Sequence, residues 1–287
     1  ADLTCTVGAG VRRDVLDAAL AERGVCLACA GEGSIGGLFA GDTIGAMTCG
    51  GPSPRSLLLG IEAVLTDGTE FRSGARVVKS VAGFDLHKLF VGSRGLLFAV
   101  AALHLKLRPL PRDQVWFERT ALDPDAACDL FRSLRRQAVP PAMLTLRREA
   151  AGFAVRGRLD GRTVYVKAML RCHELDEASP YGDLHLQAPP GGEVLAGIIN
   201  PSGVETLLAQ APPSAPFVMH GGGHFELATS AAHDSDRLLA GMPGLGARAC
   251  IALAAADRRG IGTHPDEGQR RLVAALRRAL DPDGVLV

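Results

Sequence analysis

Glycine is concentrated in the first third of the chain, and one loop there constrains the fold more than any other feature. The chain has 35 glycines among 287 residues, and the informative ones precede residue 96. The stretch Ser34-Ile35-Gly36-Gly37-Leu38-Phe39-Ala40 places two adjacent glycines after a serine. Adjacent glycines remove Cβ atoms and permit positive φ, so the backbone can lie against a flat ligand or a diphosphate. Two interpretations stay open here: a ligand-binding loop, or a glycine-rich turn packed against a strand.

The composition excludes several classes of protein. Lys plus Arg and Asp plus Glu number 31 each, and aromatic residues make up 5%, so we expect no nucleic-acid partner. No apolar run reaches the length of a membrane span. The start, Ala1 to Thr4, has no basic or apolar leader, which predicts a cytoplasmic protein. The common nucleotide motifs G-x-x-x-x-G-K-[ST] and G-x-G-x-x-G are absent.

The first 111 residues predict strands, one helix and a loop. Loop 31–51 holds too many glycines for a regular element. Alternation and apolar runs predict strands at 3–7, 61–66, 71–72 and 95–107, and a helix at 11–23 that stops at Gly24. The proline pair in Arg108-Pro109-Leu110-Pro111 predicts a domain boundary.

Residues 113–287 predict an α+β domain with an antiparallel sheet. The expected helices are 124–137, 204–210, 234–239 and 265–280, the last with Leu272, Val273, Leu276 and Leu280 on one face. The expected strands are 115–121, 143–147, 153–159 and 164–170, with a hairpin turn at Asp160-Gly161. Of the seven cysteines, Cys26 and Cys29 form a single C-x-x-C, which favours ordinary reduced thiols over a metal site.

A second stretch, from Gly74 to Gly95, identifies a family. The order is S-I-G-G-L-x-A, then R-x-L-L-G-I-E-A-V-L-x-D-G, then G-x-R-V-V-K-x-V-A-G-F-D-L-x-K-L-x-V-G-S, and finally an apolar strand ending L-K-L-R-P-L-P. This order resembles the FAD-binding fold of the vanillyl-alcohol oxidase and p-cresol methylhydroxylase (PCMH) type. Within that family it is most similar to the small FAD-binding E subunit of glycolate oxidases. The match covers about residues 3–111, with a weaker echo at Leu280 to Leu286.

The resemblance implies an α+β fold of two parts. Residues 1–111 would be the second subdomain of a partial PCMH-type FAD-binding domain, a mixed or antiparallel sheet flanked by helices, with the first subdomain absent. Residues 112–287 would be a cap-like α+β domain, whose C-terminal helix and tail return to the FAD domain. Because family members carry a further glycine loop before Leu3, we expect FAD to be held weakly or lost.

The resemblance also implies the cofactor contacts. Arg55 with Leu58-Leu59-Gly60 matches a conserved step of the motif in which Ser56 replaces aspartate. The positions that match the family's flavin contacts are Ser34, Ile35, Gly36, Gly37, Ala40, Lys79, Gly83, Phe84, Asp85, Gly92, Ser93 and Gly95. Two of the motif's residues are replaced, by Ser80 and Phe84. Phe98 stands where the family has glycine, which predicts a ring near the cofactor or a shifted backbone.

Histidines and acids give less definite indications. His220-Gly221-Gly222-Gly223-His224 resembles a shortened form of a substrate-side motif, H-x-G-D-G-N-x-H, in the family's larger subunit. We interpret it first as a turn into a strand, with contact to metal or substrate as the alternative, and predict no metal site. His87 and His104 are expected to be solvated or hydrogen-bonded, and Asp85 to cap a helix. No residue identifies itself as a catalytic base.

Two functions are therefore expected from the resemblance. The first is an FAD-dependent oxidoreductase subunit of a 2-hydroxy-acid (glycolate-type) oxidase complex, which oxidises substrate or relays electrons in glycolate catabolism. Its implied partners are a larger FAD-linked subunit and an iron–sulfur subunit. The alternative is a degenerate, flavin-free subunit that keeps the fold and a docking surface.

Overall fold

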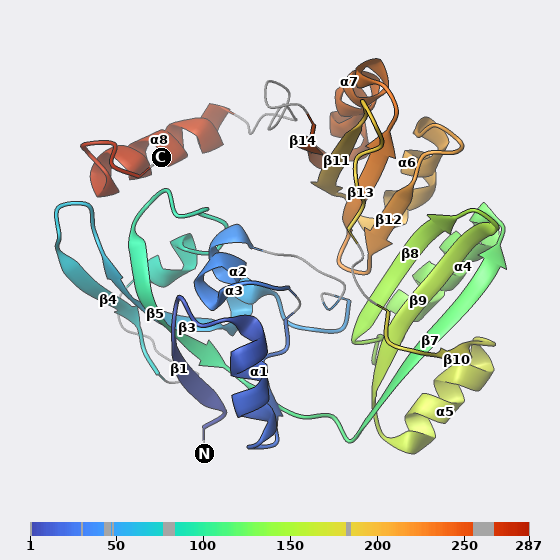
Figure 1. Ribbon diagram of the computed structural model, residues 1–287, viewed down its shortest axis with the longest axis horizontal. Coiled ribbons are helices and arrows are strands. Elements are labelled where there is room, and N and C mark those ends of the chain that lie inside the picture. Colours follow the sequence, from blue (N-terminus) through green and yellow to red (C-terminus); the bar gives the residue numbers. More distant parts are fainter. Residues whose placement is uncertain are drawn as a thin grey trace. The chain divides into compact units, whose positions relative to one another are not determined.

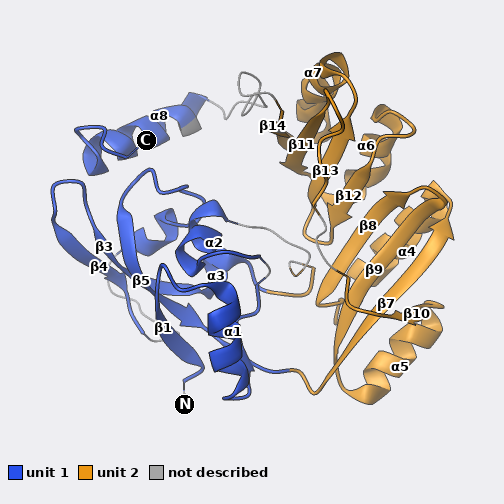
Figure 2. Ribbon diagram, in the orientation of Figure 1, with its two compact units in different colours: residues 1–44, 52–110, 265–287 blue, residues 45–51, 111–264 orange. Residues whose placement is uncertain are grey.

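The computed structural model describes residues 2–29, 31–42, 47, 49–76, 84–181, 185–254 and 267–286. The chain divides into two compact units, shown in Figure 2. Unit 1 comprises residues 1–44, 52–110 and 265–287, and unit 2 comprises residues 45–51 and 111–264. Each unit contains an antiparallel sheet with helices, so the predicted α+β fold is confirmed.

Unit 1 is built on a four-stranded antiparallel sheet in the order β1-β5-β3-β4 (Figure 1). Its strands are β1 (Thr4–Gly8), β3 (Leu58–Val64), β4 (Glu70–Gly74) and β5 (Ala99–Lys106), with a small pair β2 (Val25–Cys26) and β6 (Arg108–Pro109). Its helices are α1 (Arg13–Ala21), α2 (Ile35–Gly41), α3 (Pro54–Leu57), the 3-10 turn η2 (Leu86–Leu89) and α8 (Glu267–Leu280). The turn at Gly68, where φ is +85°, joins β3 to β4 as predicted.

The prediction of no regular element in 31–51 was wrong, because residues 35–41 form helix α2. Glycine is a poor helix former, but the helix buries Ile35, Leu38 and Phe39 in the core of unit 1. Burial of each large apolar side chain contributes about 1.5–3 kcal/mol, which exceeds the cost of about 1 kcal/mol for each helical glycine. Tertiary packing therefore overrides local propensity here.

Phe98 packs among aromatic side chains of unit 1. Its side chain is buried and makes an edge-to-face contact with Phe71 at 5.2 Å between ring centroids, and it stacks on Phe90 at 6.2 Å. Phe98 is therefore a core residue of unit 1. Ser56, another of the replacements, donates a hydrogen bond from its hydroxyl to the Ser53 carbonyl at the start of α3.

The predicted helix α8 is confirmed, but only part of its apolar face packs against the core of unit 1. Leu276 and Leu280 pack against the core of unit 1, whereas Leu272 and Val273 are exposed. The Thr66 hydroxyl donates a hydrogen bond to the Leu280 carbonyl at 3.4 Å. The end of the helix is thus held on the first unit.

Unit 2 is built on an eight-stranded antiparallel sheet in the order β10-β7-β9-β8-β12-β13-β11-β14 (Figure 1). The strands are β7 (Asp113–Leu122), β8 (Met143–Glu149), β9 (Gly152–Gly161), β10 (Asp176–Ala178), β11 (Glu193–Ile198), β12 (Phe217–His220), β13 (His224–Thr229) and β14 (Arg248–Leu253). The helices are α4 (Pro124–Arg135), α5 (Thr163–Cys172), α6 (Val204–Gln210) and α7 (Ala232–Gly241), with 3-10 turns η3 (Pro201–Gly203) and η4 (Met242–Leu245).

All four α-helices of unit 2 share one apolar core with one face of the sheet. Alternate strand residues such as Phe117, Leu146, Val155 and Phe225 meet the buried residues of α4–α7 on that face. Because side chains alternate along a strand, the intervening residues lie on the opposite face. We call this opposite side the helix-free face; it holds the small cluster Leu186, Val194, Val218 and Ala228.

The predicted hairpin strand at 164–170 was wrong, since these residues form α5. The β-branched valines suggested a strand, in which Val164 and Val166 would share a face. In the structure Val164 is 82% exposed, whereas Val166 and Met169, three residues apart, are buried. That spacing follows the helical period.

Candidate functional site

The Ser34 loop begins helix α2 and is tied to the turn after β1. The Ser34 hydroxyl accepts a hydrogen bond from the Gly37 N–H at 3.2 Å, which is an N-cap. The Ile35 N–H donates to the Val11 carbonyl at 2.9 Å, and the Gly36 N–H donates to the Ala9 carbonyl at 2.8 Å. The N–H groups of residues 35–37 therefore all have partners within the protein.

The two glycines of this loop serve different purposes. A Cβ on Gly36 would lie 2.9 Å from the Cβ of Ala9, so glycine is needed for close packing. Gly37 is exposed, and a Cβ there would meet only the Ser34 hydroxyl, at 3.0 Å. Gly33, with φ of +91°, would meet nothing within 4 Å. Bare main chain is thus open to a ligand at Gly33 and Gly37.

The second glycine stretch, residues 92–95, lies against the other end of α2. The Gly92 N–H donates to the Phe39 carbonyl at 3.1 Å and the Arg94 N–H donates to the Ala40 carbonyl at 2.9 Å. These bonds join carbonyls in the last turn of α2, of which the Phe39 carbonyl also accepts from the Asp42 N–H at 3.1 Å. The Ser93 hydroxyl accepts from the Gly95 N–H at 3.3 Å, and both Gly92 and Gly95 have positive φ.

The structure therefore brings the two glycine stretches to the two ends of one short helix. Helix α2 has seven residues, which at about 1.5 Å per residue separates its ends by roughly 10 Å. A Cβ at Gly95 would meet nothing within 4 Å, so this second stretch also has open backbone. Ser34, Gly37, Gly92, Ser93 and Gly95 thus offer glycine backbone and two hydroxyls at the two ends of α2, which suits a flat cofactor.

The other residues that were predicted to contact the cofactor differ in their exposure to solvent. Ile35 is fully buried, and Ala40 is half-buried against the core. Phe84 is 92% exposed. Lys79 and Gly83 lie outside the described residues, as does Ser80.

The prediction that Asp85 caps a helix was half correct. Asp85 stands at the N-cap position of η2, but its side chain accepts no capping hydrogen bond. Its carboxylate lies 4.0 Å from His87 Nε2 instead.

His87 and His104 are hydrogen-bonded, as predicted. His87 Nδ1 lies 3.2 Å from the Ser73 hydroxyl, which also accepts from the His87 N–H at 2.9 Å. His104 Nδ1 lies 2.9 Å from the Thr6 hydroxyl. Burial lowers the pKa of both imidazoles, so both are neutral near pH 7.

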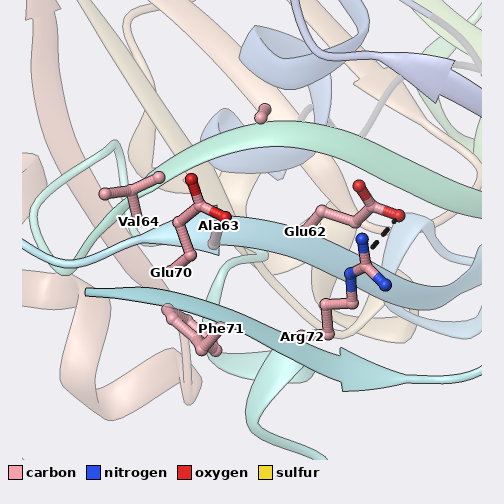
Figure 3. Close-up of a pocket in the computed structure, with 7 residues that line it drawn as sticks. Glu62, Ala63, Val64, Glu70, Phe71 and Arg72 are labelled. Carbon is pink, nitrogen blue, oxygen red and sulfur yellow. Dashed lines mark ion pairs between the residues drawn. The ribbon is translucent and has the colours of Figure 1, made fainter. Parts of the chain in front are cut away.

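A hollow of about 530 Å³ lies on β3 and β4 and is shown in Figure 3. Glu62 and Arg72 point toward one another there, with 3.8 Å between the carboxylate and Arg72 Nε. Arg76 and His104 approach the same Glu62 oxygen at 3.7 Å each. The charges compensate one another and no residue of the glycine stretches lines this hollow, so we do not assign it as the cofactor site.

A second group of polar residues lies on the helix-free face of unit 2. Strand register places Glu118, Arg156, Thr145 and His220 in one row across β7, β9, β8 and β12. His224 follows on β13, where its ring stacks on His220 with 5.7 Å between centroids and 6° between planes. The prediction that 220–224 turns into a strand is thus confirmed, because it is the tight connection between β12 and β13.

Several polar atoms on this face lack partners. Five buried side-chain atoms in the described part of the chain have no partner with hydrogen-bond geometry: Thr145 Oγ1, Arg156 Nε, Tyr181 OH, His220 Nδ1 and His224 Nδ1. Tyr181 joins the face through an edge-to-face contact with Trp116 at 4.8 Å. Because buried polar groups are nearly always hydrogen-bonded, this concentration favours a polar ligand or ordered water at the row.

The row is largely uncharged apart from its ion pairs. Burial, with smaller effects of His224 and His185, lowers the pKa of His220 to about 3. Burial also lowers the pKa of His224. Burial raises the pKa of Tyr181 to about 12. Two neutral imidazoles and two hydroxyls can donate or accept hydrogen bonds to a small polar molecule.

Glu226 is a site residue that the sequence interpretation missed. Its buried carboxylate lies 2.5 Å from His185 Nδ1 and accepts from the Leu186 N–H at 2.7 Å. Strand alternation could have identified it, since Glu226 follows His224 by two positions and shares its face. Within the described residues, no group of three or more His, Cys, Asp or Glu side chains could hold a metal ion.

Comparisons with known proteins agree with this geometry. Residues 1–74 match the family described as FAD binding domain. Glycolate oxidase subunit GlcE of Escherichia coli (strain K12) is 32% identical over 123 residues, which are 41% of this chain and 35% of that protein. Subunit GlcD of Bacillus subtilis (strain 168) is 36% identical over 90 residues, 31% of this chain and 19% of that protein. The matches thus span about a third of these relatives or less.

Solved structures extend the likeness to the whole fold. Alkyldihydroxyacetonephosphate synthase superposes on 99% of this chain and 64% of its own, with a TM-score of 0.70 and 12% identity. At that identity the likeness shows the fold alone. Residues 1–74 therefore resemble an FAD binding domain, and the chain shares the fold of this solved structure.

The similarity to glycolate oxidase subunit GlcE agrees with the resemblance that the sequence motifs predicted. The cofactor that the family model describes is FAD. In the part of the chain that the structure describes, no helix is both long enough and apolar enough to cross a membrane.

Proposed function

We propose that this chain is the FAD-binding subunit of a complex that oxidises a small 2-hydroxy acid such as glycolate. The observation that carries the proposal is the arrangement at α2, where both glycine stretches flank one helix inside the segment that matches an FAD-binding domain. The residues that would hold the flavin are Ser34, Gly37, Gly92, Ser93 and Gly95, with Phe84 exposed nearby in the sequence.

Bound FAD would supply the oxidation itself, since flavins accept a hydride or single electrons. The glycine main chain would bring protein backbone close to the flat ring system and the diphosphate. The polar row on unit 2 supports the choice of substrate class. Thr145, His220, His224 and Tyr181 place buried polar atoms on one face of the sheet, and a hydroxy acid has a hydroxyl and a carboxylate to pair with them.

The partners belong to the same proposal. Relatives named as glycolate oxidase subunits support assembly with a larger FAD-linked subunit. The seven cysteines are scattered, so an iron–sulfur cluster would be held by a separate subunit. A cytoplasmic location fits these partners.

One observation favours the alternative, a flavin-free structural subunit. The N–H groups of Ile35, Gly36, Gly37 and Gly92 already donate to protein acceptors, so the loops are complete without a diphosphate. Such a chain would keep the fold and bind the larger subunit without cofactor.

Purification of the full chain by itself, followed by a binding test with the larger subunit, separates the two functions. A chain that holds flavin, seen as a visible flavin absorption band released on denaturation, is expected from the main proposal. A colourless chain that takes up no added FAD but still binds the larger subunit would support the alternative. Turnover with a 2-hydroxy acid then tests the substrate class.

A further inference from the structure

In unit 1, the side chains of Arg55 and Lys88 each donate a hydrogen bond to the backbone carbonyl of the other residue. Lys88 Nζ donates to the Arg55 carbonyl at 2.7 Å, and Arg55 Nη1 donates to the Lys88 carbonyl at 2.8 Å. Lys88 Nζ also donates to the Leu58 carbonyl at the start of β3. The exchange joins α3 and β3 to η2, two segments about 30 residues apart in the chain.

This arrangement is unusual for an ammonium group. Lys88 is half-buried and is held by carbonyls, and no ion pair within 4 Å joins it to an acid among the described residues. Burial lowers its pKa, and the nearby Arg55 guanidinium lowers it further, whereas Asp85 raises it. Burying a cation beside another cation costs free energy. The hydrogen bonds of Lys88 to main-chain carbonyls must therefore offset this cost by holding the segments that they join.

What Lys88 fixes is the segment from Phe84 to Gly95, here called the flavin segment. Apart from η2 it has no helix or strand, and the Asp85 side chain does not cap η2. At its far end Gly92 and Arg94 are tied to α2. The exchange at Lys88 precedes the turn that presents Ser93 and Gly95, and the bonds of Gly92 and Arg94 to α2 hold the turn itself.

We infer that Arg55 and Lys88 are positioning residues that preorganise the flavin segment for its cofactor. This inference rests on the proposed FAD-binding function. Ordering a backbone segment costs conformational entropy. We call the hydrogen bonds between Arg55 and Lys88 the clasp. If the clasp orders the flavin segment before FAD binds, most protein molecules are competent to bind FAD. Loss of the clasp lowers the competent fraction, and the apparent affinity for FAD falls in proportion.

The test compares Lys88→Met, Lys88→Arg and wild type in the full chain. Lys88→Met keeps the aliphatic stem but removes the donor, and is expected to weaken FAD binding about ten-fold, as when the competent fraction falls to a tenth. Lys88→Arg keeps a cation that can donate to both carbonyls and is expected to restore most of the affinity. Lys167→Met, at an exposed position of α5 in unit 2, is the control.

Two readouts are needed: FAD affinity by quenching of flavin fluorescence, and amide hydrogen exchange of residues 84–95 without FAD. The inference expects faster exchange in that segment for Lys88→Met, with exchange in unit 2 unchanged. If Lys88→Met fails to fold, Arg55→Gln replaces it, because it removes only one of the three bonds. Unchanged affinity and unchanged exchange in a folded variant would overturn the inference.

The exchange experiment also separates this inference from the proposed function. If wild type takes up no FAD, the proposed function fails. Exchange in residues 84–95 then still reports on the clasp, and equal exchange in wild type and Lys88→Met would overturn it independently.

Discussion

Gly36 and Ala9 are in such close contact that a Cβ on Gly36 would lie 2.9 Å from the Cβ and 3.0 Å from the carbonyl oxygen of Ala9. The same two residues share a backbone hydrogen bond of 2.8 Å. This contact fixes the start of α2 against the turn after β1. The absence of a side chain at Gly36 therefore has a packing reason, independent of any ligand.

The Gly36–Ala9 contact predicts a stability loss for Gly36→Ala. The added methyl group must displace backbone, so we expect a loss of about 1–3 kcal/mol in unfolding free energy. Gly10→Ala is the matched control, because a Cβ there meets nothing within 4 Å. Urea unfolding of both variants measures the difference, and equal midpoints would contradict the packing argument.

Phe98 provides a second prediction. Because its ring is buried between Phe71 and Phe90, Phe98→Ala should lower the unfolding free energy by about 3–5 kcal/mol. Phe84→Ala should change stability by no more than about 0.5 kcal/mol, since that ring is almost fully exposed. If Phe84 contacts the cofactor, the same variant should bind FAD more weakly. A stable Phe98→Ala protein would contradict the assignment of Phe98 to the core.

Helix α8 distinguishes two kinds of leucine. Leu276 packs on the core of unit 1, whereas Leu272 is 60% exposed. Leu276→Ala should therefore destabilise the protein by roughly 1–2 kcal/mol, below the full-burial range because the side chain is only partly buried. Leu272→Ala should have an effect within about 0.5 kcal/mol. A larger drop in melting temperature for Leu272→Ala than for Leu276→Ala would contradict this packing of the helix.

The buried His220 predicts a dependence of stability on pH. Its pKa falls from 6.5 to about 3 in the folded protein, so the unfolded chain binds a proton in the intervening range and the folded chain does not. Stability from this group is complete above about pH 6.5 and is lost as the pH falls toward 3. His220→Gln should flatten the decline between about pH 6.5 and 4, leaving the part due to His224.

His233 provides the control for that measurement. Its side chain is 80% exposed, so His233→Gln shows what the loss of an exposed histidine does to the unfolding free energy. Equal slopes for wild type and His220→Gln would show that His220 is not held neutral by burial.

Sequence patterns predicted most strands before residue 160 and the long amphipathic helices because their periods are local, but they did not predict β10, β11 or β14. Leu3 to Val7 and the helix around Leu276 are examples. Helices α2 and α5 were missed, since Gly36 and Val164 disfavour helix locally and only burial of residues such as Phe39 and Val166 outweighs that preference. Such burial depends on partners distant in the chain.

The candidate sites divide in the same way. Motif order located Gly37 and Gly95, and the structure places their segments at the ends of α2. The order of motifs in the sequence could not show that Gly36 lacks a side chain because it packs against Ala9. Nor could it show that Thr145 lies in register with His220. Both are relations between strands or loops that no local pattern contains.

The central claim is that residues 34–42 and 84–95 together bind FAD. Amide hydrogen exchange of the full chain, measured with and without saturating FAD, tests it most directly. The account predicts slower exchange in both segments when FAD is present, with β11 and β13 of unit 2 unchanged. Identical exchange in both segments, in a folded protein exposed to excess FAD, would contradict it.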